Sequence, residues 1–447
     1  MKTTCLFLAA TGAVALNLDD PTLAVADKWA AWKQQFSFEG DELAAMAKFV
    51  ATEARIVAHN AKGLSYKFGH NQFSAMTPQE FKDNVVGHTD MKRTGPFDFA
   101  TFSNSTVTAD AVDWVTKGAV TPVKDQAQCG SCWAFSSTGS LEGAFQIATG
   151  KLTSFSEEQL VQCATKSGNQ GCNGGLMDNS FKWWQQYPPV LESDYPYTSG
   201  SGTTGKCTTT KHTAAAKVGG FKDVSSETAM EKALNVGPVS VAIEADKSIF
   251  QSYTSGVITG KACGTQLDHG VLAVGYGTQG SQAYWKVKNS WGATWGVKGY
   301  VLLAKGTDEC GIADGPPSYP TGVTAPATIQ KQPTVATGAP ATSHYGDPLV
   351  NDCMSDEQNI TITGVAGSVC SPAATGILKQ KCPTDVPTGC TIVPKALLQD
   401  QSGDKYCALE CSPSLPIKDQ KLADSICGVD NMSCKPISGV GICTYDA

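Results

Sequence analysis

The chain has 447 residues, of which 41% are hydrophobic and 17% charged, and its formal net charge is −7. This length exceeds that of most single domains, so we expect more than one folded unit. The mildly acidic balance and the lack of a long basic run argue against nucleic acid as a partner.

Residues 1–16 have the pattern of a secretory signal peptide. Lys2 supplies a positive start, Leu6–Leu16 is apolar, and Ala13-Val14-Ala15 fits a small-residue cleavage site. The apolar stretch is too short to cross a bilayer, and no other segment is a transmembrane candidate. We expect a secretory route, to the outside of the cell or to a lysosome-like or vacuole-like compartment. Such a route permits disulfides among the 16 cysteines that remain after Cys5 is removed.

Residues 17–108 contain no cysteine and are rich in helix-forming residues. Trp29 and Trp32 lie three apart, as on one face of a helix. An apolar stripe continues this period and closes at Asn60; its members are Leu43, Met46, Phe49, Val50 and Ile56. On periodicity alone, this part of the chain is a helical subdomain.

Residues 109–320 hold seven cysteines and seven of the nine tryptophans. In the run Gln126-Ala-Gln-Cys-Gly-Ser-Cys-Trp-Ala-Phe-Ser136, Cys132 stands at the start of a mostly buried helix that Gly150 ends. The positive end of a helix dipole favours the thiolate form of a cysteine there. A redox pair of Cys129 and Cys132 would require a strand that leads into the helix, and a zinc site would require a second Cys/His pair. We interpret Cys132 as a nucleophile, with no metal.

A cysteine nucleophile needs a base, and residues 109–320 contain two histidines, His212 and His269. His212 follows a Thr-rich loop and is typical of a solvated surface. His269 lies in the apolar, strand-like run Leu267–Tyr276. A lone histidine on a strand is more often a satisfied core residue, but Gly270 beside it leaves room for a substrate backbone. We therefore interpret His269 as the base.

Asn289 lies twenty residues beyond His269. Alone it is equally typical of a turn, but with the other motifs it is the group that orients the imidazole. Trp291 and Trp295 are expected to cover the hydrogen bond between Asn289 and His269 and to keep water away from it.

In their order and spacing, these motifs resemble those of papain-like cysteine proteases, specifically the cathepsin L-like branch, over about residues 25–320. The resemblance implies an α+β fold of two subdomains with a cleft between them. The helical subdomain starts at Cys132, and a β-rich, barrel-like subdomain carries His269 and Asn289. Gln126 matches the oxyanion-hole glutamine of the family, and the backbone N–H of Cys132 is the second donor.

The implied activity is that of a cysteine endopeptidase acting on protein and peptide substrates through a thioester acyl-enzyme, with no cofactor. Cys132 and His269 are expected to rest as a thiolate–imidazolium pair. No insertion resembles the occluding loop of carboxydipeptidase relatives. Two rivals are a non-catalytic protein on the same fold and an acyl transferase such as a transglutaminase. The presence of Cys132 argues against the first, and the Gln126–Cys132 spacing argues against the second.

The resemblance also implies substrate contacts and disulfides. Gly174 and Gly175 match glycines that bind an extended substrate backbone, and we expect Trp291 to contact the substrate as well. The pocket for the residue before the cleaved one is lined by Leu176, Met177, Ala242, Leu267 and Gly315, which favours a bulky apolar side chain. Spacing alone allows fifteen disulfide pairings. The family pattern implies Cys129–Cys172, Cys163–Cys207 and Cys263–Cys310.

Residues 17–108 resemble the inhibitory propeptide of this family. The matching positions of its helix motif are Phe49, Ile56 and Asn60, whereas Asp41, Ala45 and Thr52 replace the usual Glu, Arg and Asn. The following element is intact at Gly69, Asn71 and Phe73, but Ala75 replaces its usual Asp. We expect a monomeric zymogen whose propeptide is an intramolecular inhibitor and is cleaved between residues 105 and 112.

Residues 321–346 form a Pro/Thr/Ala linker, and residues 347–447 carry nine cysteines with few aromatics, which is typical of a disulfide-stapled module. Because nine is odd, one of these cysteines is free, pairs between chains, or is wrongly assigned to the module. The module lies outside the resemblance, and binding of substrate or carbohydrate, targeting and removal all stay open as its role. Glycosylation sequons occur at Asn104, Asn359 and Asn431.

Overall fold

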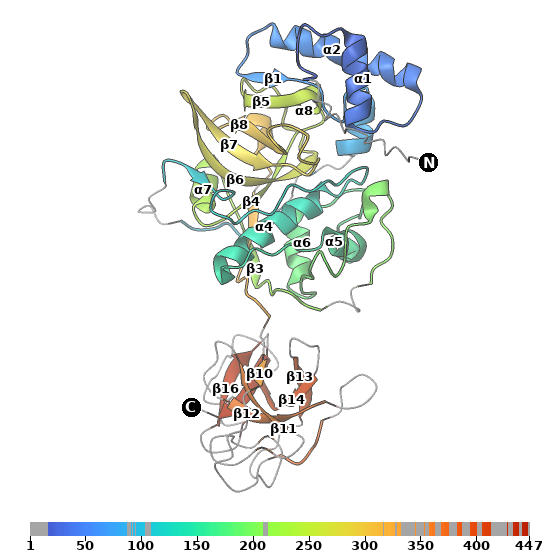
Figure 1. The fold of residues 1–447 in the computed structure, drawn as a ribbon. Helices are drawn as coiled ribbons and strands as arrows, with labels where there is room; N and C mark the ends of the chain where they lie inside the picture. Colours follow the sequence, from blue (N-terminus) through green and yellow to red (C-terminus); the bar gives the residue numbers. More distant parts are fainter. Residues whose placement is uncertain are drawn as a thin grey trace, which may run out of the picture. The chain divides into compact units, whose positions relative to one another are not determined.

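Two units make up the computed structural model, Met1–Thr324 and Ala325–Ala447, and each is described by itself (Figure 1). The structure describes residues 17–86, 91, 93, 95–102, 109–208, 213–315 and 317–326, and short stretches between 329 and 445. The predicted signal at residues 1–16, His212, Asn104 and Asn431 lie outside these ranges. Among the described helices, none combines the length and apolar character that crossing a membrane requires.

The N-terminal segment, residues 17–108, begins with two helices, α1 (Val25–Gln35) and α2 (Glu42–Asn60). Trp29 and Trp32 of α1 are buried, and their rings stack with centroids 5.3 Å apart. Asp41 is the N-cap of α2, since its side chain accepts hydrogen bonds from the next two free N–H groups of the helix. The helical period and the end of the second helix at Asn60 are confirmed.

The apolar stripe predicted for α2 is wrong at two positions. Leu43 is 82% exposed and Val50 is 43% exposed, whereas Ala45 and Thr52 are buried. The buried face of a helix is decided by the elements that pack against it, and here these are α1 and strand β1 (Tyr66–Phe68). Ala45 and Thr52, which depart from the family motif, therefore lie on the packed face.

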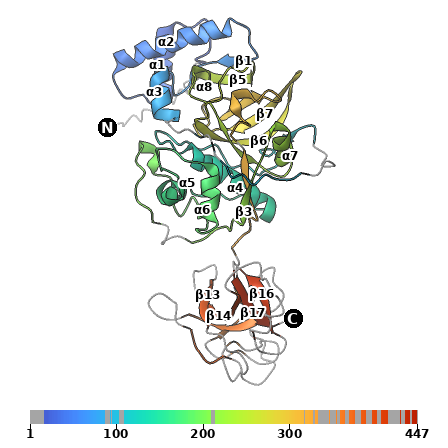
Figure 2. The same cartoon turned by 180° about the vertical axis from the view of Figure 1, so that it is seen from behind.

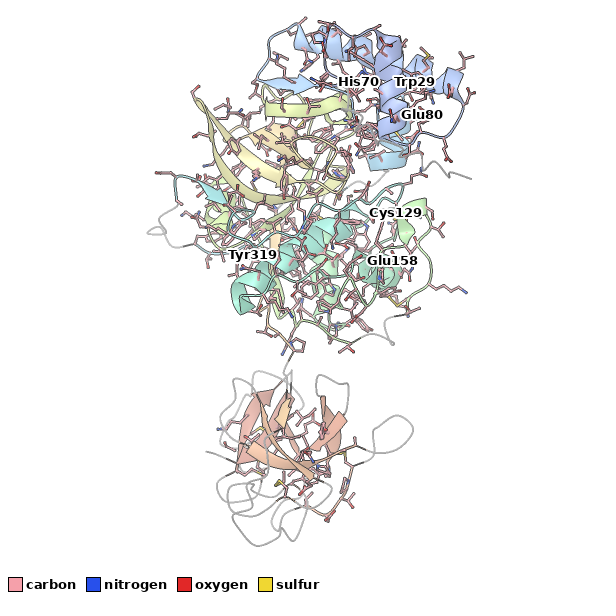
Figure 3. The ribbon with its side chains drawn as sticks, in the orientation of Figure 1. Trp29, His70, Glu80, Cys129, Glu158 and Tyr319 are labelled. Atoms are coloured by element: carbon pink, nitrogen blue, oxygen red, sulfur yellow. A yellow bond between two sulfur atoms is a disulfide. The ribbon has the colours of Figure 1, made fainter. Side chains whose placement is uncertain are left out.

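Further contacts complete this segment (Figure 3). The buried His70 ring stacks on Phe49 at 4.0 Å, and its Nε2 lies 2.9 Å from a carboxylate oxygen of Glu53. The short helix α3 (Pro78–Phe81) has a capping box made by Thr77 and Glu80, and it leads into a π-helical turn, η1 (Lys82–Val86). Phe81 of α3 and Val85 and Val86 of the turn are buried in the apolar core that includes the sheet.

The helical part of the first unit is built on α4 (Cys132–Thr149), which ends at Gly150 in the left-handed conformation with φ 75°. The helix predicted from Cys132 to Gly150 is confirmed. The other helical elements here are α5 (Glu157–Cys163), η2 (Ala164–Ser167), α6 (Met177–Trp184) and η3 (Ser199–Ser201). In both views α4, α5 and α6 lie on the side of the sheet away from α1 and α2 (Figures 1 and 2).

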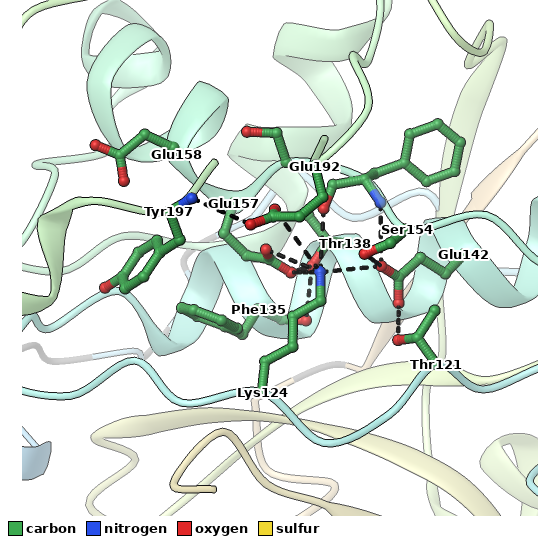
Figure 4. Close-up of polar contacts among 12 residues, drawn as sticks. Thr121, Lys124, Phe135, Thr138, Glu142, Ser154, Glu157, Glu158, Glu192 and Tyr197 are labelled. Carbon is green, nitrogen blue, oxygen red and sulfur yellow. Dashed lines mark hydrogen bonds and ion pairs between the residues drawn. The ribbon is translucent and has the colours of Figure 1, made fainter. Parts of the chain in front are cut away.

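A buried ion cluster joins α4 to α5 (Figure 4). Lys124 Nζ lies 2.7 Å from Glu157, 3.2 Å from Glu142 and 3.9 Å from Glu192. Burial raises the pKa of Glu157 to about 8, although Lys124 opposes the shift. Burial also opposes protonation of Lys124, but the surrounding carboxylates outweigh it and raise the pKa of the ammonium. Lys124 thus supplies the ion pairs to all three carboxylates, and the buried Lys288 lies nearby, bonded to Thr121.

A nine-stranded sheet forms the rest of the first unit, in the order β1-β5-β8-β7-β6-β4-β9-β3, with β2 paired to β6. Its strands after β1 are β2 (Val112–Asp113), β3 (Gly220–Asp223), β4 (Val239–Ile243), β5 (Tyr253–Ile258), β6 (His269–Gln279), β7 (Gln282–Lys288), β8 (Tyr300–Ala304) and β9 (Ser318–Thr321). Helices α7 (Glu227–Leu234) and α8 (Ser248–Ser252) and the turn η5 (Glu309–Gly311) connect them. The strand predicted around His269 is confirmed from that residue onward.

The N-terminal segment joins this sheet directly. β1 pairs antiparallel with β5, and Tyr66 lies opposite Gly256. Phe73, Phe81, Val85 and Val86 belong to the same apolar core as the sheet residues Trp285 and Val287. A second core lies among α4, α5 and α6 and includes Trp133 and Phe181. The expected α+β fold of helical and β-rich parts is confirmed, with the N-terminal segment continuous with the β-rich part.

The C-terminal unit is β-rich in its described stretches. Its six-stranded sheet contains β10 (Ile329–Lys331), β11 (Glu357–Ile362), β12 (Ser368–Pro372), β15 (Glu410–Ser412), β16 (Met432–Ile437) and β17 (Val440–Tyr445), and β13 (Lys395–Gln399) pairs with β14 (Lys405–Ala408). Its disulfides are Cys353–Cys370, Cys382–Cys407, Cys411–Cys434 and Cys427–Cys443. The ninth cysteine, Cys390, and most of the predicted linker lie outside the described residues. Asn359 is in β11.

Candidate active site

Two strands and one helix bring three of the predicted site residues together. Cys132 is the first residue of α4, His269 is the first residue of β6, and Asn289 directly follows β7. β6 and β7 pair antiparallel, which places Asn289 beside His269. Gly270 lies so close to α4 that a Cβ added to it would come within 3.2 Å of the Trp133 Cα. The start of β6 and the start of α4 therefore meet without a side chain between them.

The imidazole of His269 is completely buried and held on one side only. Its Nε2 lies 2.7 Å from Oδ1 of Asn289. Its Nδ1 has no hydrogen-bond partner among the described residues. The Trp291 ring stacks on the imidazole with centroids 4.6 Å apart, and Trp295 packs edge-on against Trp291 at 5.0 Å. Trp291 thus covers the histidine directly, while Trp295 supports Trp291.

The thiol of Cys132 is free and buried. Burial raises its pKa to about 11, and burial lowers the pKa of His269 to about 4. Burial thus disfavours the charged form of both groups in this structure, whereas the sequence predicts a thiolate–imidazolium pair at rest. The difference has a physical cause, since the N-terminal segment covers the site and excludes the water that would solvate two charges. The ion pair stays a prediction for the uncovered enzyme.

Gln126 is oriented by a residue that the sequence reasoning missed. Ser290 Oγ donates a hydrogen bond to the Gln126 Oε1 at 2.7 Å, which turns the amide nitrogen toward the site. Gln126 Nε2 then donates to the carbonyl of Cys129 at 3.0 Å and to the carbonyl of Val85 at 3.1 Å. Val85 belongs to the N-terminal segment. Its carbonyl therefore takes up a hydrogen bond that a substrate carbonyl would need, and only the adjacency of Ser290 to Asn289 hinted at this support.

The five predicted pocket residues gather around Met91 of the N-terminal segment. Met91 is 1% exposed and shares a core cluster with Met177, Ala242 and Leu267, against which Leu176 packs. Its N–H donates to the carbonyl of Leu267 at 2.9 Å. A Cβ added at Gly315 would lie 2.5 Å from the Leu267 side chain, so Leu267 packs directly against the glycine. No sequence pattern singled out Met91.

Disulfides and glycines shape the loop before the nucleophile. The structure forms Cys129–Cys172, Cys163–Cys207 and Cys263–Cys310, the same pairs that the resemblance implies. The Gly130 N–H also donates to the carbonyl of Cys172 at 2.9 Å, which braces the loop ahead of α4. Gly175 lies against the Trp133 indole, 2.7 Å from a hypothetical Cβ, and Gly174 has φ 109°. Both glycine positions therefore exclude larger residues.

Comparisons with known proteins agree with this geometry. The family model described as papain family cysteine protease matches residues 108–321, and the model described as cathepsin propeptide inhibitor domain (I29) matches residues 29–81. Cathepsin L of Sarcophaga peregrina is 43% identical over 323 residues, which cover 67% of this chain and 94% of that protein. This chain belongs to the papain family of cysteine proteases. It is a cysteine endopeptidase that carries its own propeptide as an intramolecular inhibitor.

Other relatives extend over the same part of the protease. Digestive cysteine proteinase 3 of Homarus americanus is 42% identical over 334 residues, covering 72% of this chain and all of that protein. Among solved structures, digestive procathepsin L 3 of the Tenebrio molitor larval midgut matches with a TM-score of 0.60 and 35% identity, covering 66% of this chain and 98% of that one. A recombinant stem bromelain precursor matches with a TM-score of 0.61 and 32% identity over 66% of this chain and 98% of that one. The zymogen form of this protease therefore has solved counterparts.

Proposed function

We propose that Cys132 is the nucleophile of this endopeptidase, that His269 is its base and acid, and that Asn289 orients the imidazole. One observation carries the proposal. The buried His269 ring is held at Nε2 by Asn289, while its Nδ1 has no hydrogen-bond partner among the described residues. A free thiol, that of Cys132, lies at the start of α4. One nitrogen is thus fixed and the other is available for proton transfer.

The catalytic steps follow from these positions. Once the N-terminal propeptide segment, residues 17–108 and called the prosegment from here on, has left and water reaches the site, the proton of the Cys132 thiol moves to Nδ1 of His269. The sulfur attacks the peptide carbonyl, and Gln126 Nε2 with the backbone N–H of Cys132 stabilises the oxyanion. His269 then gives its proton to the leaving amine. Water hydrolyses the thioester with His269 as base, which restores the thiol.

We also propose a preference for a bulky apolar residue one before the cleaved residue. The support is Met91, whose long apolar side chain is buried among the predicted pocket residues. Gly315 lets Leu267 pack against the backbone there, where a Cβ would come within 2.5 Å. For maturation we propose cleavage between residues 105 and 112. We place the enzyme in the secretory pathway, outside the cell or in a lysosome-like or vacuole-like compartment, because its first 16 residues read as a signal peptide and both units contain disulfides.

Acid activation of the full-length zymogen followed by an epoxide-type thiol trap tests the proposal. We expect a single label on Cys132, found by peptide mass mapping, and loss of all peptidase activity after labelling. Cys132→Ala should leave an intact, inactive zymogen with the same thermal transition. Activity of Cys132→Ala equal to wild type, or a label on another residue, would overturn the assignment.

A further inference from the structure

Two carboxylates of the peptidase domain enclose an arginine of the prosegment. Arg93 Nε lies 3.3 Å from Oδ1 of Asp178, and Arg93 Nη1 lies 2.6 Å from Oδ1 of Asp223. The side chains are almost completely buried, with 8% of Arg93, 7% of Asp178 and 1% of Asp223 exposed. Asp178 is in the first turn of α6, and Asp223 ends β3. The planar guanidinium therefore spans the gap between a helix and a strand.

The carboxylate of Asp223 depends on the prosegment for both of its partners. Besides Arg93, it accepts a hydrogen bond from the N–H of Asp98 at 2.7 Å. The backbone of Asp223 also donates to the Asp98 carbonyl at 2.9 Å and accepts from the Ala100 N–H at 2.8 Å. All three of these residues precede the proposed cleavage window of 105–112. Removal of the prosegment therefore takes away both partners that the structure gives this carboxylate, which favours a replacement donor.

The remaining cations nearby do not fill this role in the structure. Lys182 lies 3.3 Å from Asp178, but its side chain is 55% exposed and its ammonium also lies over the Phe221 ring. Lys222 is 40% exposed and pairs with Asp98, itself a prosegment residue. After maturation the cations left nearby are thus the solvated ammonium groups of Lys182 and Lys222, and neither replaces the buried guanidinium of Arg93.

The acidic pair adjoins the predicted specificity pocket. Asp178 directly follows the pocket residue Met177, and Arg93 is two residues beyond Met91, which fills that pocket. Three prosegment residues contact the site in chain order. The Val85 carbonyl accepts a hydrogen bond from the Gln126 amide, Met91 packs in the pocket, and Arg93 pairs with the two carboxylates. Since the pocket receives the residue before the cleaved one, the acidic pair lies still farther from the scissile bond on the same side. An extended peptide covers about 7 Å in two residues, so one chain reaches both sites.

We propose that Asp178 and Asp223 form a substrate subsite for a basic side chain, with arginine preferred, two residues N-terminal to the residue in the apolar pocket. Arg93 occupies the subsite in the zymogen and vacates it on maturation. Arginine is favoured over lysine because its planar fork presents separate N–H donors to two carboxylates, as Arg93 does. This inference rests on the proposed catalytic residues and on cleavage after Ala100.

The test uses mature enzyme obtained by acid activation of the full-length chain. Two peptides are compared that share phenylalanine at the pocket position and differ only by arginine or glutamine two residues upstream. We expect kcat/KM to favour the arginine peptide by about tenfold or more, because the contact joins a buried charge pair. The preference should fall as ionic strength rises, since part of it is electrostatic attraction of the peptide.

Variants decide whether the acidic pair is the cause. Asp223→Asn should reduce the arginine preference, the ratio of kcat/KM for the two peptides, to below threefold. Asp194→Asn, which removes an exposed carboxylate, is the matched control and should retain the full preference. If Asp223→Asn lowers the yield of mature enzyme, Asp178→Asn carries the same expectation, because that side chain already faces solvent-exposed Lys182.

The outcomes separate two failures. An equal rate on both peptides in wild type, or an arginine preference that survives both Asp223→Asn and Asp178→Asn, overturns the subsite. Failure of the proposed function shows differently, since the glutamine peptide would then be cleaved as well by Cys132→Ala as by wild type.

Discussion

Phe81→Ala in the prosegment should open the zymogen without unfolding it. Phe81 is fully buried, and its ring lies 5.3 Å from Phe73 in the prosegment and 5.3 Å from Trp291 in the peptidase domain. Phe73 also meets Trp291 edge-on at 5.7 Å. The three rings join the prosegment to the tryptophan that covers His269, so loss of one ring weakens closure at the site itself.

The expected loss of closure free energy follows from the two rings that the Phe81 ring contacts, one in the prosegment and one in the peptidase domain. Truncation of a buried phenylalanine to alanine costs about 3–5 kcal/mol. Because one of the two neighbouring rings stays with Phe81 when the prosegment leaves, we assign about half of this cost, about 2 kcal/mol, to closure. At 1.4 kcal/mol per factor of ten, the open fraction should rise about 30-fold.

The open fraction is measured by the rate at which the thiol trap labels Cys132 in the full-length zymogen at pH 7. Only the open form exposes the buried thiol, so the rate is proportional to the open population. Leu43→Ala is the control, since Leu43 is 82% exposed on the same prosegment and should leave the rate unchanged. A rise of less than threefold for Phe81→Ala, with an unchanged thermal transition, would show that the aromatic contact does not hold the prosegment closed.

Three further results are expected. Burial lowers the pKa of His269 to about 4 and also lowers that of His70, so both histidines bind protons more readily when exposed. Opening of the zymogen should therefore increase as pH falls from about 6.5 toward 4. It is measured as the labelling rate of the zymogen relative to that of the mature enzyme at each pH, and a flat profile would contradict this. Asn289→Ala should lower kcat about 100-fold with little change in KM, because His269 loses the group that orients it; an unchanged kcat would remove Asn289 from the mechanism. Lys124→Met should reduce the free energy of unfolding by about 3–5 kcal/mol in urea titrations, since it strands buried carboxylates, and a loss below 1 kcal/mol would mean that the cluster adapts.

Local chemistry made the central elements of the site predictable. The apolar run after Cys132 and the glycine at position 150 predict α4 and its end, and both are found there. The run around His269 predicts a strand, which β6 confirms. Each of these depends on backbone preferences and side-chain periodicity within about twenty residues, which the sequence contains in full.

Contacts between distant parts of the chain were not predictable in the same way. Leu43 and Val50 have the right period but are exposed, because α1 and β1 pack on the neighbouring face of α2, which keeps Phe49 and Ile56 buried and adds Ala45 and Thr52. Burial in the assembled structure raises the pKa of Cys132 and lowers that of His269. Ionisation depends on the dielectric surroundings, and these are a property of the assembled structure.

The sequence by itself determined which residues are available for thiol chemistry and in what order they occur. The tertiary structure alone decided what surrounds them: Ser290 orients Gln126, Met91 fills the apolar pocket, and Arg93 joins Asp178 to Asp223. Such contacts join segments tens to more than a hundred residues apart. They are created when the sheet and helices pack, and no local pattern in the chain encodes them.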